Sequence, residues 1–432
     1  MPILPFGATA ADFRWCTGIE DTFVIHTRPG LRPLDEYELM GHYDRWREDL
    51  ALARATGARM IRWGIPWYRV EPEPGRFDWS WTDQVLPYIV EELGLELILD
   101  LVHYGTPLWL ERSFIDPRYP EAVAAYARAV AERYHGLLHY YTPFNEPVIN
   151  SLMCGKRGVW PPYRHGDRGY LAVGVGVAKG IVRTVRALKE VDPDAVMVHV
   201  EAAGLTRAAR EDLDPLAAVN RHRGYVFLDL ITGRITPEHP FFAWLLAHGV
   251  RQDELRQFAD RPIDLDVLGL NFYPQWSTKQ LATDARGRPY YQLVERDGAG
   301  FASLITDYYE HYRAPIMITE TSAKGSIETK RRWLAASVAT TGHLRKQGVP
   351  VVGYSWFPLF TMVDWKYRTG RKPRNKYLVE LGLYESEIET DGTLRYAPTE
   401  LVEQFHAYTL NPQLAVGDLR PELAAASWVA AS

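Results

Sequence analysis

Two glutamates in this chain each follow a short apolar run that is typical of a buried strand. Glu146 lies in YYTPFNEP, residues 140–147, and Glu320 lies in IMITETS, residues 316–322. Glycoside hydrolysis uses such a pair: one carboxylic acid protonates the leaving oxygen, and one carboxylate attacks or activates water. A single glutamate at the end of a strand is as often an ion-pair partner as a catalyst. The surrounding sequence has to decide between these two interpretations.

The elements that would position this pair form an alternating pattern. Eight short apolar runs predict strands at 13–18, 59–63, 95–101, 139–143, 196–200, 267–271, 316–319 and 351–355. Between them, 3.6-residue periodicity predicts helices, among others at 34–56, 121–135, 170–191 and 330–347. The strands are apolar on both faces, as parallel strands covered by helices are. This pattern predicts an α/β protein, a single (β/α)8 TIM barrel over residues 1–432.

The connecting segments suggest where the site of such a barrel would lie. Residues 160–169, 275–300 and 365–378 are long, polar and rich in Arg, Gly and Pro, and we expect them to be elaborated loops. Each connects to the C-terminal end of a predicted strand, the face on which barrel enzymes hold their sites. No linker or repeat divides the chain. We expect residues 412–432 to form a peripheral tail.

Composition excludes several classes of protein. The chain has 49 basic and 54 acidic residues, a net charge of -5, and no basic stripe, so nucleic acid is not an expected partner. No apolar run approaches the ~18 residues that span a bilayer, and the N-terminus lacks a signal-peptide pattern. These features favour a cytoplasmic protein without a membrane partner. They leave the oligomeric state open.

Cofactor motifs are not found in the sequence. Cys16 and Cys154, the only cysteines, lack metal-ligand spacing and are expected to be reduced and structural. There is no His/Cys/Asp cluster with ligand spacing and no Gly-rich phosphate loop, so neither a metal nor an organic cofactor is expected. Aromatic residues make up 12% of the chain. They could pack sugar rings, although a Trp-rich core explains the composition equally well.

The segments around the two glutamates, TPFNEP and ITETS, resemble the TFNEP and ITENG motifs of glycoside hydrolase family 1. Further segments resemble motifs of the same family in the same order, up to about residue 410. These segments are DFRWCTGIE (12–20), GHYDRWREDLALARATGARMIRWGIPWYRV (41–70), LVHYGTP (101–107), GKRGVWPP (155–162), DVLGLNFY (266–273) and GYSWFPLFTMVDW (353–365). The chain is thus identified as a divergent, β-glucosidase-like member of that family.

The resemblance implies a retaining β-glycosidase that hydrolyses O-glycosidic bonds by double displacement. Glu146 would be the acid/base and Glu320 the nucleophile, with Asn145 bonding the sugar 2-hydroxyl. A negative Glu320 would keep Glu146 protonated by like-charge repulsion until Glu320 carries the sugar. Retention requires the two carboxyls to stand ~5 to 5.5 Å apart. The expected partner is a small glycoside.

The resemblance also implies a set of residues around the sugar. Arg62 would hold Glu320 ionised, Tyr273 would orient the same carboxylate by a hydrogen bond, and Asn271 would stand nearby. His103 would bond a glycone hydroxyl, the alternative being a buried histidine bonded to backbone.

Strand 8 and the loop after it carry three further residues of this kind. Trp356 would form the sugar platform, with a cis peptide between it and Phe357. Asp364 and Trp365 resemble a Glu-Trp pair that reads the outer hydroxyls.

Two departures from the family pattern alter the expected glycone pocket. The glutamine that clasps two glycone hydroxyls is absent from TGIED, residues 17–21, where Glu20 is the nearest candidate to replace it. Asp364 is one methylene shorter than the family glutamate. These changes do not decide whether the glycone is a gluco, galacto, manno or modified sugar. The cations at 366, 368, 371 and 372 are also compatible with a phosphorylated or acidic sugar. The alternatives are a transglycosidase, a β-mannosidase-like enzyme or a carbohydrate-binding pseudoenzyme.

Overall fold

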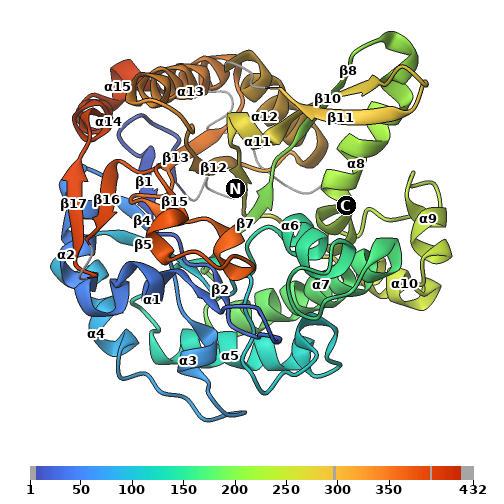
Figure 1. Ribbon diagram of the computed structural model, residues 1–432, viewed down its shortest axis with the longest axis horizontal. Coiled ribbons are helices and arrows are strands. Elements are labelled where there is room, and N and C mark those ends of the chain that lie inside the picture. The colour runs from blue at the N-terminus through green and yellow to red at the C-terminus, as the bar shows by residue number, and fades with distance from the viewer. Residues whose placement is uncertain (1–5, 295–297, 390–391, 420–432) are drawn as a thin grey trace.

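Eight parallel strands close into a barrel in the computed structural model, which describes residues 6–294, 298–389 and 392–419. The strand order around the barrel is β1-β13-β12-β9-β7-β6-β5-β4 (Figure 1). The bounds are β1 (Arg14–Gly18), β4 (Met60–Gly64), β5 (Glu96–Asp100), β6 (Tyr140–Thr142), β7 (Val196–Ala202), β9 (Val267–Asn271), β12 (Ile316–Thr321) and β13 (Val351–Trp356). All eight predicted strands are present, so the predicted TIM barrel is confirmed.

Helices surround this barrel and cover its outer face (Figure 1). They are α1 (Glu36–Met40), α2 (His42–Ala55), α3 (Trp67–Val70), α4 (Thr82–Pro87), α5 (Tyr119–Arg133), α6 (Pro147–Ser151), α7 (Gly166–Val191), α8 (Asp214–Ile231), α9 (Phe242–Ala247), α10 (Gln252–Asp260), α11 (Pro274–Ser277), α12 (Gly298–Tyr312), α13 (Ile327–Gln347), α14 (Glu400–Leu410) and α15 (Pro412–Ala415). The helix predicted at 34–56 is divided into α1 and α2. Gly41 at φ 71 causes the break, because this left-handed conformation suits glycine and ends a helix.

Apolar side chains fill the lower part of the barrel, toward the N-terminal ends of the strands. Side chains of a strand alternate between its two faces, so Met60 points to the same side as Arg62, which reaches the centre of the barrel. Ten buried residues make up this group, called here the interior cluster: Phe6, Cys16, Met60, Ile98, Val198, Val200, Val267, Met317, Val352 and Leu419. The cluster packs the barrel below the polar strand ends.

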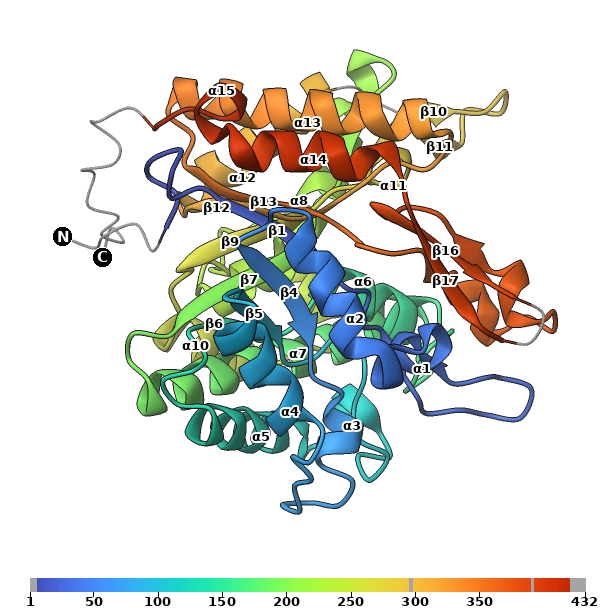
Figure 2. The same ribbon diagram turned by 90° about the vertical axis from the view of Figure 1, so that its left-hand side faces the viewer.

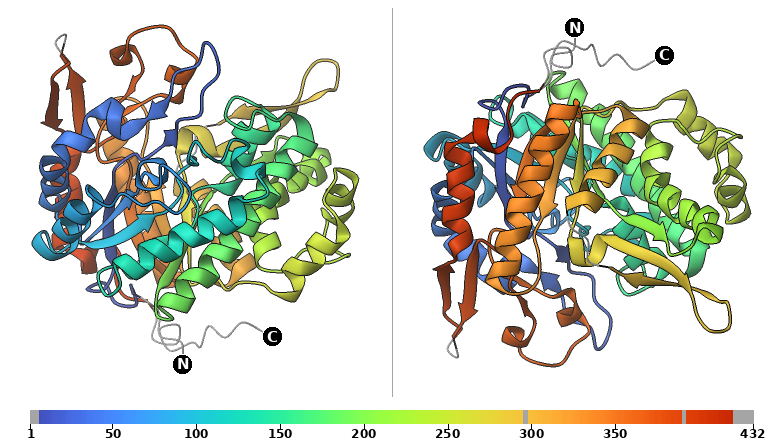
Figure 3. Two further views of the ribbon diagram at one scale, coloured as in Figure 1. Left: turned by 90° about the horizontal axis from the view of Figure 1, so that it is seen from below. Right: turned by 90° about the horizontal axis from the view of Figure 1, so that it is seen from above.

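One predicted loop contains regular structure. Within 275–300, β10 (Thr278–Thr283) and β11 (Pro289–Leu293) form an antiparallel hairpin, and β10 pairs in parallel with β8 (Leu205–Ala208). The predicted elaborated loop therefore contains a hairpin that the sequence analysis did not anticipate, and 295–297 lie outside the described residues. Figure 3 shows this hairpin in yellow, projecting from the body of the molecule.

Three two-stranded sheets lie outside the barrel in the described part of the chain. The pairs are β2 (Phe23–Val24) with β3 (Leu34–Asp35), β14 (Met362–Val363) with β15 (Leu378–Val379), and β16 (Tyr384–Ile388) with β17 (Leu394–Pro398). Figure 2 shows β16 and β17 extending beside α1 at one side of the barrel. Short 3-10 turns at Trp365–Arg368 and Arg374–Lys376 occupy the predicted loop at 365–378.

The last residues that the structure describes before position 420 are packed against the barrel. Leu419 is buried in the interior cluster and its amide donates to the Ala8 carbonyl at 3.1 Å. The side chain of Arg345 donates to the carbonyls of Gly417 and Gly7 at 3.0 and 2.8 Å. The predicted peripheral tail is therefore wrong for residues 416–419, which these contacts hold against the barrel, whereas residues 412–415 lie at the surface, where Leu414 is 88% exposed. Residues 420–432 lie outside the described residues.

Two further properties bear on the sequence predictions. Cys16 and Cys154 are buried free thiols, as expected, and burial raises the pKa of Cys16 to about 12. Among the helices of the described residues, none has the length and apolar content needed to cross a membrane.

Candidate active site

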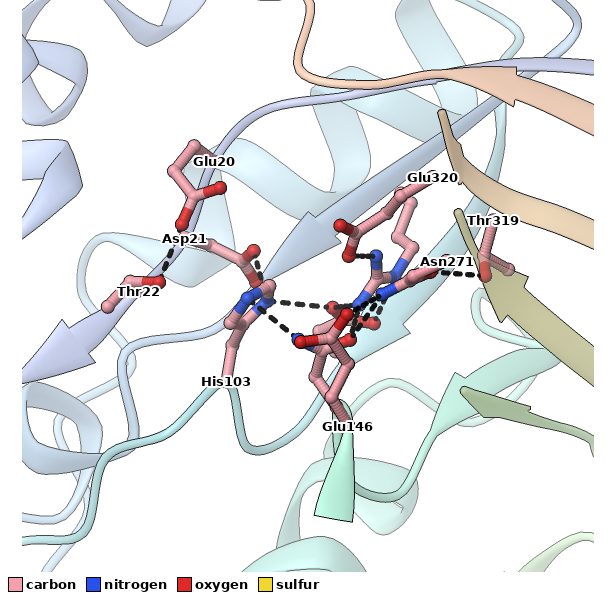
Figure 4. A network of polar contacts seen from close by, with 12 residues as sticks. Glu20, Asp21, Thr22, His103, Glu146, Asn271, Thr319 and Glu320 are labelled. Atoms are coloured by element: carbon pink, nitrogen blue, oxygen red, sulfur yellow. Dashed lines mark hydrogen bonds and ion pairs between the residues drawn. The ribbon is translucent and has the colours of Figure 1, made fainter. Parts of the chain in front are cut away.

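Polar side chains gather where the barrel strands end. Arg62 lies on β4, Asp100 ends β5, Asn145 and Glu146 follow β6, Asn271 ends β9, and Glu320 lies on β12. All six are buried. Because parallel strands meet at a common edge, residues distant in sequence form one network there (Figure 4). The two glutamates picked out by the sequence belong to this single network.

Glu320 is held by two donors. The Arg62 guanidinium makes an ion pair with its Oε1, and the Tyr273 hydroxyl donates to its Oε2 at 2.7 Å. Both contacts were predicted from the sequence and both are present. Both oxygens of the Glu320 carboxyl group are therefore engaged, one by a buried cation and one by a hydroxyl donor, and these contacts hold the side chain in one orientation.

Glu146 lies in a different environment. Its backbone adopts the left-handed conformation, with φ 47, directly before α6. Burial and the nearby Glu320 carboxylate raise the pKa of Glu146 to about 7. Its Oε1 accepts from the Asn271 amide at 2.9 Å, and its Oε2 accepts from the Tyr104 hydroxyl. A carboxyl group with this pKa can give and take a proton near neutral pH.

Asn145 connects the two carboxyl groups. Its Oδ1 accepts from Arg62 Nη2 at 2.7 Å and from Asn271 Nδ2 at 3.2 Å, and its Nδ2 donates to His103 Nε2 at 2.9 Å. The Asn145 side chain is fully buried. Its polar atoms are thus engaged within the protein, and its expected bond to a sugar 2-hydroxyl stays a prediction.

His103 lies inside the network with both ring nitrogens engaged. Nδ1 lies 2.6 Å from Asp21 Oδ1, and Nε2 meets the Asn145 amide (Figure 4). Burial lowers the pKa of His103, but the charge of Asp21 and the hydrogen bonds with Asp100 and Asp21 outweigh it and raise this pKa well above its usual value. The ring nitrogens of His103 thus contact side chains, and the alternative of a ring bonded to the backbone is wrong. The expected contact with a glycone hydroxyl stays a prediction.

The sequence reasoning missed two buried aspartates. Asp100 accepts from Arg62 Nε at 3.0 Å, and Asp21 lies against Gly64, where a Cβ would stand 1.7 Å from Asp21 Oδ2. Asp100 could have been found, because it is the polar last residue of an apolar strand. Asp21 carries no such signal, since only the fold brings it to His103.

Among the described residues, one group has the proximity of metal ligands. Ligand atoms of Asp21, Asp100 and His103 all lie within 4.8 Å of one another. Arg62 is already paired with Asp100, with Nη2 2.5 Å from Oδ2. A cation bound between these residues would be repelled by that guanidinium. The geometry therefore fits an ion-pair network better than a metal site.

Glu20 occupies the edge of the same buried region. Its Oε1 accepts from the Thr22 hydroxyl at 2.5 Å. Burial raises its pKa to about 7, with Glu320 and Asp21 contributing, while His103 opposes the shift. Glu20 thus lies within electrostatic reach of the nucleophile candidate and of His103. This position is consistent with the predicted place beside the glycone, and the contact itself stays a prediction.

The segment after β13 departs from the expected geometry at one peptide bond. The cis peptide lies between Phe357 and Pro358, not between Trp356 and Phe357 as predicted. A cis amide costs far less before proline than before other residues, which favours the observed position. Trp356 is fully buried, and its indole donates to the Leu381 carbonyl at 3.0 Å. Its role as a sugar platform stays a prediction.

The residues after β14 cover the site from one side. Trp365 packs edge-on against Trp160 and Tyr104, with ring centroids 4.9 and 5.6 Å apart. Asp364 caps the following turn, where its Oδ1 accepts from the Lys366 amide at 2.8 Å. The buried Arg368 donates to the Val24 carbonyl at 2.8 Å. The four cations at 366, 368, 371 and 372 had suggested a phosphorylated or acidic sugar. One of them, Arg368, instead binds backbone carbonyl groups.

Comparison with known proteins identifies the class to which this fold and site belong. The family model for glycosyl hydrolase family 1 matches residues 7–290. The chain therefore belongs to glycosyl hydrolase family 1, as the motifs indicated. The match includes Glu146 and ends before Glu320, whose place in the site comes from the structure.

Individual relatives are distant. Beta-glucosidase A of Thermotoga maritima is 23% identical over 357 residues, which cover 75% of this chain and 78% of that protein. The galactolipid galactosyltransferase SFR2 of Arabidopsis thaliana is 23% identical over 352 residues, 76% of this chain but 52% of that protein. A solved Thermotoga maritima beta-glucosidase in complex with deoxynojirimycin has a TM-score of 0.79 at 18% identity, covering 93% of this chain and 98% of that one. This similarity shows a shared barrel fold.

Proposed function

We propose that this chain is a retaining β-glycosidase that hydrolyses O-glycosidic bonds, with Glu320 as nucleophile and Glu146 as acid/base. One observation carries the proposal: two carboxyl groups in one buried network have opposite environments. Glu320 is paired with a guanidinium, whereas Glu146 has a pKa raised to about 7. A carboxyl group held against a cation and a second one whose pKa is raised are suited to separate roles.

In the first half of the reaction, the Glu146 proton passes to the leaving oxygen while Glu320 Oε attacks the anomeric carbon. The bond to the aglycone breaks and a glycosyl ester of Glu320 forms. Tyr273 and Arg62, which contact the two oxygens of Glu320, hold the carboxylate for this attack.

In the second half, Glu146 is a carboxylate and takes a proton from water. Esterification removes the charge of Glu320, so the repulsion that raised the pKa of Glu146 disappears. Water then attacks the anomeric carbon and Glu320 leaves as a carboxylate, which gives net retention of configuration.

The substrate class follows from the family and the relatives. We propose a small β-glycoside as substrate, in keeping with the beta-glucosidase relative, and a cytoplasmic location in keeping with the sequence. The galactosyltransferase relative favours one alternative, transfer of the glycosyl group to an acceptor other than water. A β-mannosidase-like specificity remains an alternative because the glutamine expected near residues 17–21 is absent, with Glu20 as the nearest candidate to replace it. A pseudoenzyme is disfavoured by the presence of Glu146, Glu320 and Arg62.

A panel of aryl β-glycosides with gluco, galacto and manno configuration tests this proposal. We expect release of the chromophore from at least one member, and proton NMR should show the β-anomer as the first sugar product. A first product of α configuration would contradict the retaining mechanism. Absence of turnover with every member, together with measurable sugar binding, would favour the pseudoenzyme.

A further inference from the structure

Tyr104 contacts the acid/base candidate directly, yet the sequence motifs did not single it out. It follows His103 just beyond β5 and occupies the position of Trp in the LYHWDLP motif that LVHYGTP resembles. Its backbone has φ 70, a conformation that few residues other than glycine adopt. Such outliers persist where the surrounding structure fixes them, and they gather at functional sites.

Packing fixes the Tyr104 ring on several sides. The ring is buried and lies edge-on to His103 at a centroid distance of 4.7 Å, with Trp160 at 5.2 Å and Trp365 at 5.6 Å. A ring held in this way cannot turn its hydroxyl elsewhere without moving its neighbours. The hydroxyl is therefore directed at one target, Glu146 Oε2.

The contact with Glu146 is a donor contact. Burial and the Glu146 carboxylate raise the pKa of the Tyr104 phenol well above its usual value, so the hydroxyl keeps its proton throughout the working pH range. Asn271 donates to the other oxygen of the same carboxyl group. Hydrogen bonds donated to a carboxylate stabilise its charged form. Each oxygen of Glu146 thus accepts a hydrogen bond that lowers the pKa of this carboxyl group. Burial and the Glu320 charge act in the opposite direction and raise it.

From this geometry we propose that Tyr104 is a positioning residue that fixes the Glu146 carboxyl group and stabilises its carboxylate in the second half-reaction. This inference rests on the proposed role of Glu146 as acid/base. When water attacks the glycosyl ester, Glu146 must be ionised to take the water proton. The Tyr104 hydroxyl keeps its own proton and donates a hydrogen bond to Oε2 during that step.

The variant Tyr104→Phe removes the hydroxyl and keeps the ring. Loss of a donor to the carboxylate should raise the pKa of Glu146, so the alkaline limb of the kcat/KM profile should move up by about one pH unit. With a highly activated aryl glycoside, for which the second half-reaction limits turnover, kcat should fall about 10-fold. Under those conditions the first half-reaction should change less.

Two matched variants separate this role from a general effect of losing a buried hydroxyl. Tyr273→Phe removes a donor to Glu320 and leaves both donors to Glu146 in place, so the alkaline limb should not move. Tyr126→Phe should leave both limbs of the kcat/KM profile unchanged. Tyr126 lies in the hydrophobic core outside the interior cluster, and its hydroxyl has no hydrogen-bond partner within the described part of the chain. An alkaline limb that stays in place in Tyr104→Phe would overturn the proposal.

A measurement on the unsubstituted ring covers the case in which Tyr104→Phe does not fold. With tyrosine labelled at Cζ, one ring signal should titrate with a pKa of about 7 and should stop titrating in Glu146→Gln. If no tyrosine signal depends on Glu146, the proposal fails. This readout needs no turnover. Failure of the proposed function would show instead as unsubstituted enzyme that is inactive on the whole aryl glycoside panel.

Discussion

The two ends of the barrel are built from the same strands in opposite ways. On β4, Met60 belongs to the apolar interior cluster, and two residues later Arg62 reaches Glu320. On β5, Ile98 lies in the same cluster and Asp100 binds Arg62. One step along the inward face of each strand thus changes the barrel interior from apolar packing to a polar network.

The two ends of the barrel differ in how strictly each side chain requires a specific interaction partner. Apolar packing in the cluster depends on volume, so similar side chains can replace one another at modest cost. In the network, each buried polar group needs its own partner, and removal of one leaves the others desolvated and unpaired. We therefore expect substitutions of similar size to have very different effects at the two ends.

The largest effect is expected for Glu320→Gly in the polar network. If Glu320 is the nucleophile, as proposed, turnover should fall by roughly five orders of magnitude, because the covalent intermediate cannot form. Azide or formate should restore part of the activity and give a product inverted from β to α. The check is the rate with an activated aryl glycoside, with NMR of the product. A rescued product with retained configuration would contradict the assignment.

Next in size is the contrast between Arg62→Met and Met317→Leu. Arg62→Met leaves Glu320 and Asp100 buried without their cation and should lower the free energy of unfolding by about 3–5 kcal/mol at neutral pH. Met317→Leu in the interior cluster keeps volume and should cost less than about 1.5 kcal/mol. Urea unfolding of both variants measures the contrast. Equal losses would remove the distinction between the two ends.

Stability should also depend on pH through two carboxyl groups of the buried site. Glu20 and Glu146 have pKa values of about 7 in the fold against 4.5 for an ordinary glutamate. The folded state therefore holds these protons more tightly, and the stability they contribute is complete below pH 4.5 and lost as pH rises through 7. The loss should be of the order of 3 kcal/mol for each group.

Unfolding at pH 5 and pH 8 measures this dependence. Glu20→Gln and Glu146→Gln should each lose less stability between the two pH values than the parent protein. Val352→Ala in the interior cluster should be destabilised equally at both, because no charge is involved. A parent protein that gains stability from pH 5 to pH 8 would contradict the raised pKa values.

A smaller effect, on specificity, is expected at Glu20. A carboxylate only accepts hydrogen bonds, whereas an amide also donates, so Glu20→Gln should change the ratio of kcat/KM among gluco, galacto and manno substrates. Glu20→Ala should cost about 2 kcal/mol in transition-state binding through the hydroxyls left unpaired. Thr22→Val, which removes the hydroxyl that binds Glu20, is the matched control and should weaken the same preference. An unchanged ratio in all three variants would remove Glu20 from the glycone pocket.

The smallest effect is expected on removal of divalent ions. If Asp21, Asp100 and His103 form an ion-pair network with Arg62, exhaustive treatment with a chelator should leave turnover unchanged. Loss of activity that a divalent ion restores would instead make these residues a metal site.

The same contrast explains how far sequence reasoning could go. Parallel strands that are buried on both faces have sequences of continuous apolar residues, so all eight barrel strands could be predicted. The contacts of Arg62 and Tyr273 with Glu320 followed from the family motifs at matching positions. Asp21 and Tyr104 were missed because their importance arises from neighbours on other strands.

The missed outer structure has a related cause. Strand β11 is exposed along its whole length, so it lacks the apolar pattern that marks a buried strand. Strand β10 pairs with β8, which is remote in sequence, and no local pattern reports such a pairing. The docked position of Leu419 likewise depends on contact with the other end of the chain.

This contact between Leu419 and Ala8 has a consequence for folding. The lower end of the barrel is completed by segments from opposite ends of the chain, linked through Arg345. Contacts of such large sequence separation carry a high loop-closure entropy and form late. A chain that emerges from the ribosome N-terminus first has therefore released both Glu146 and Glu320 before this lower end can close. Until then, the nascent barrel leaves apolar side chains of its interior open to water and to other unfolded chains.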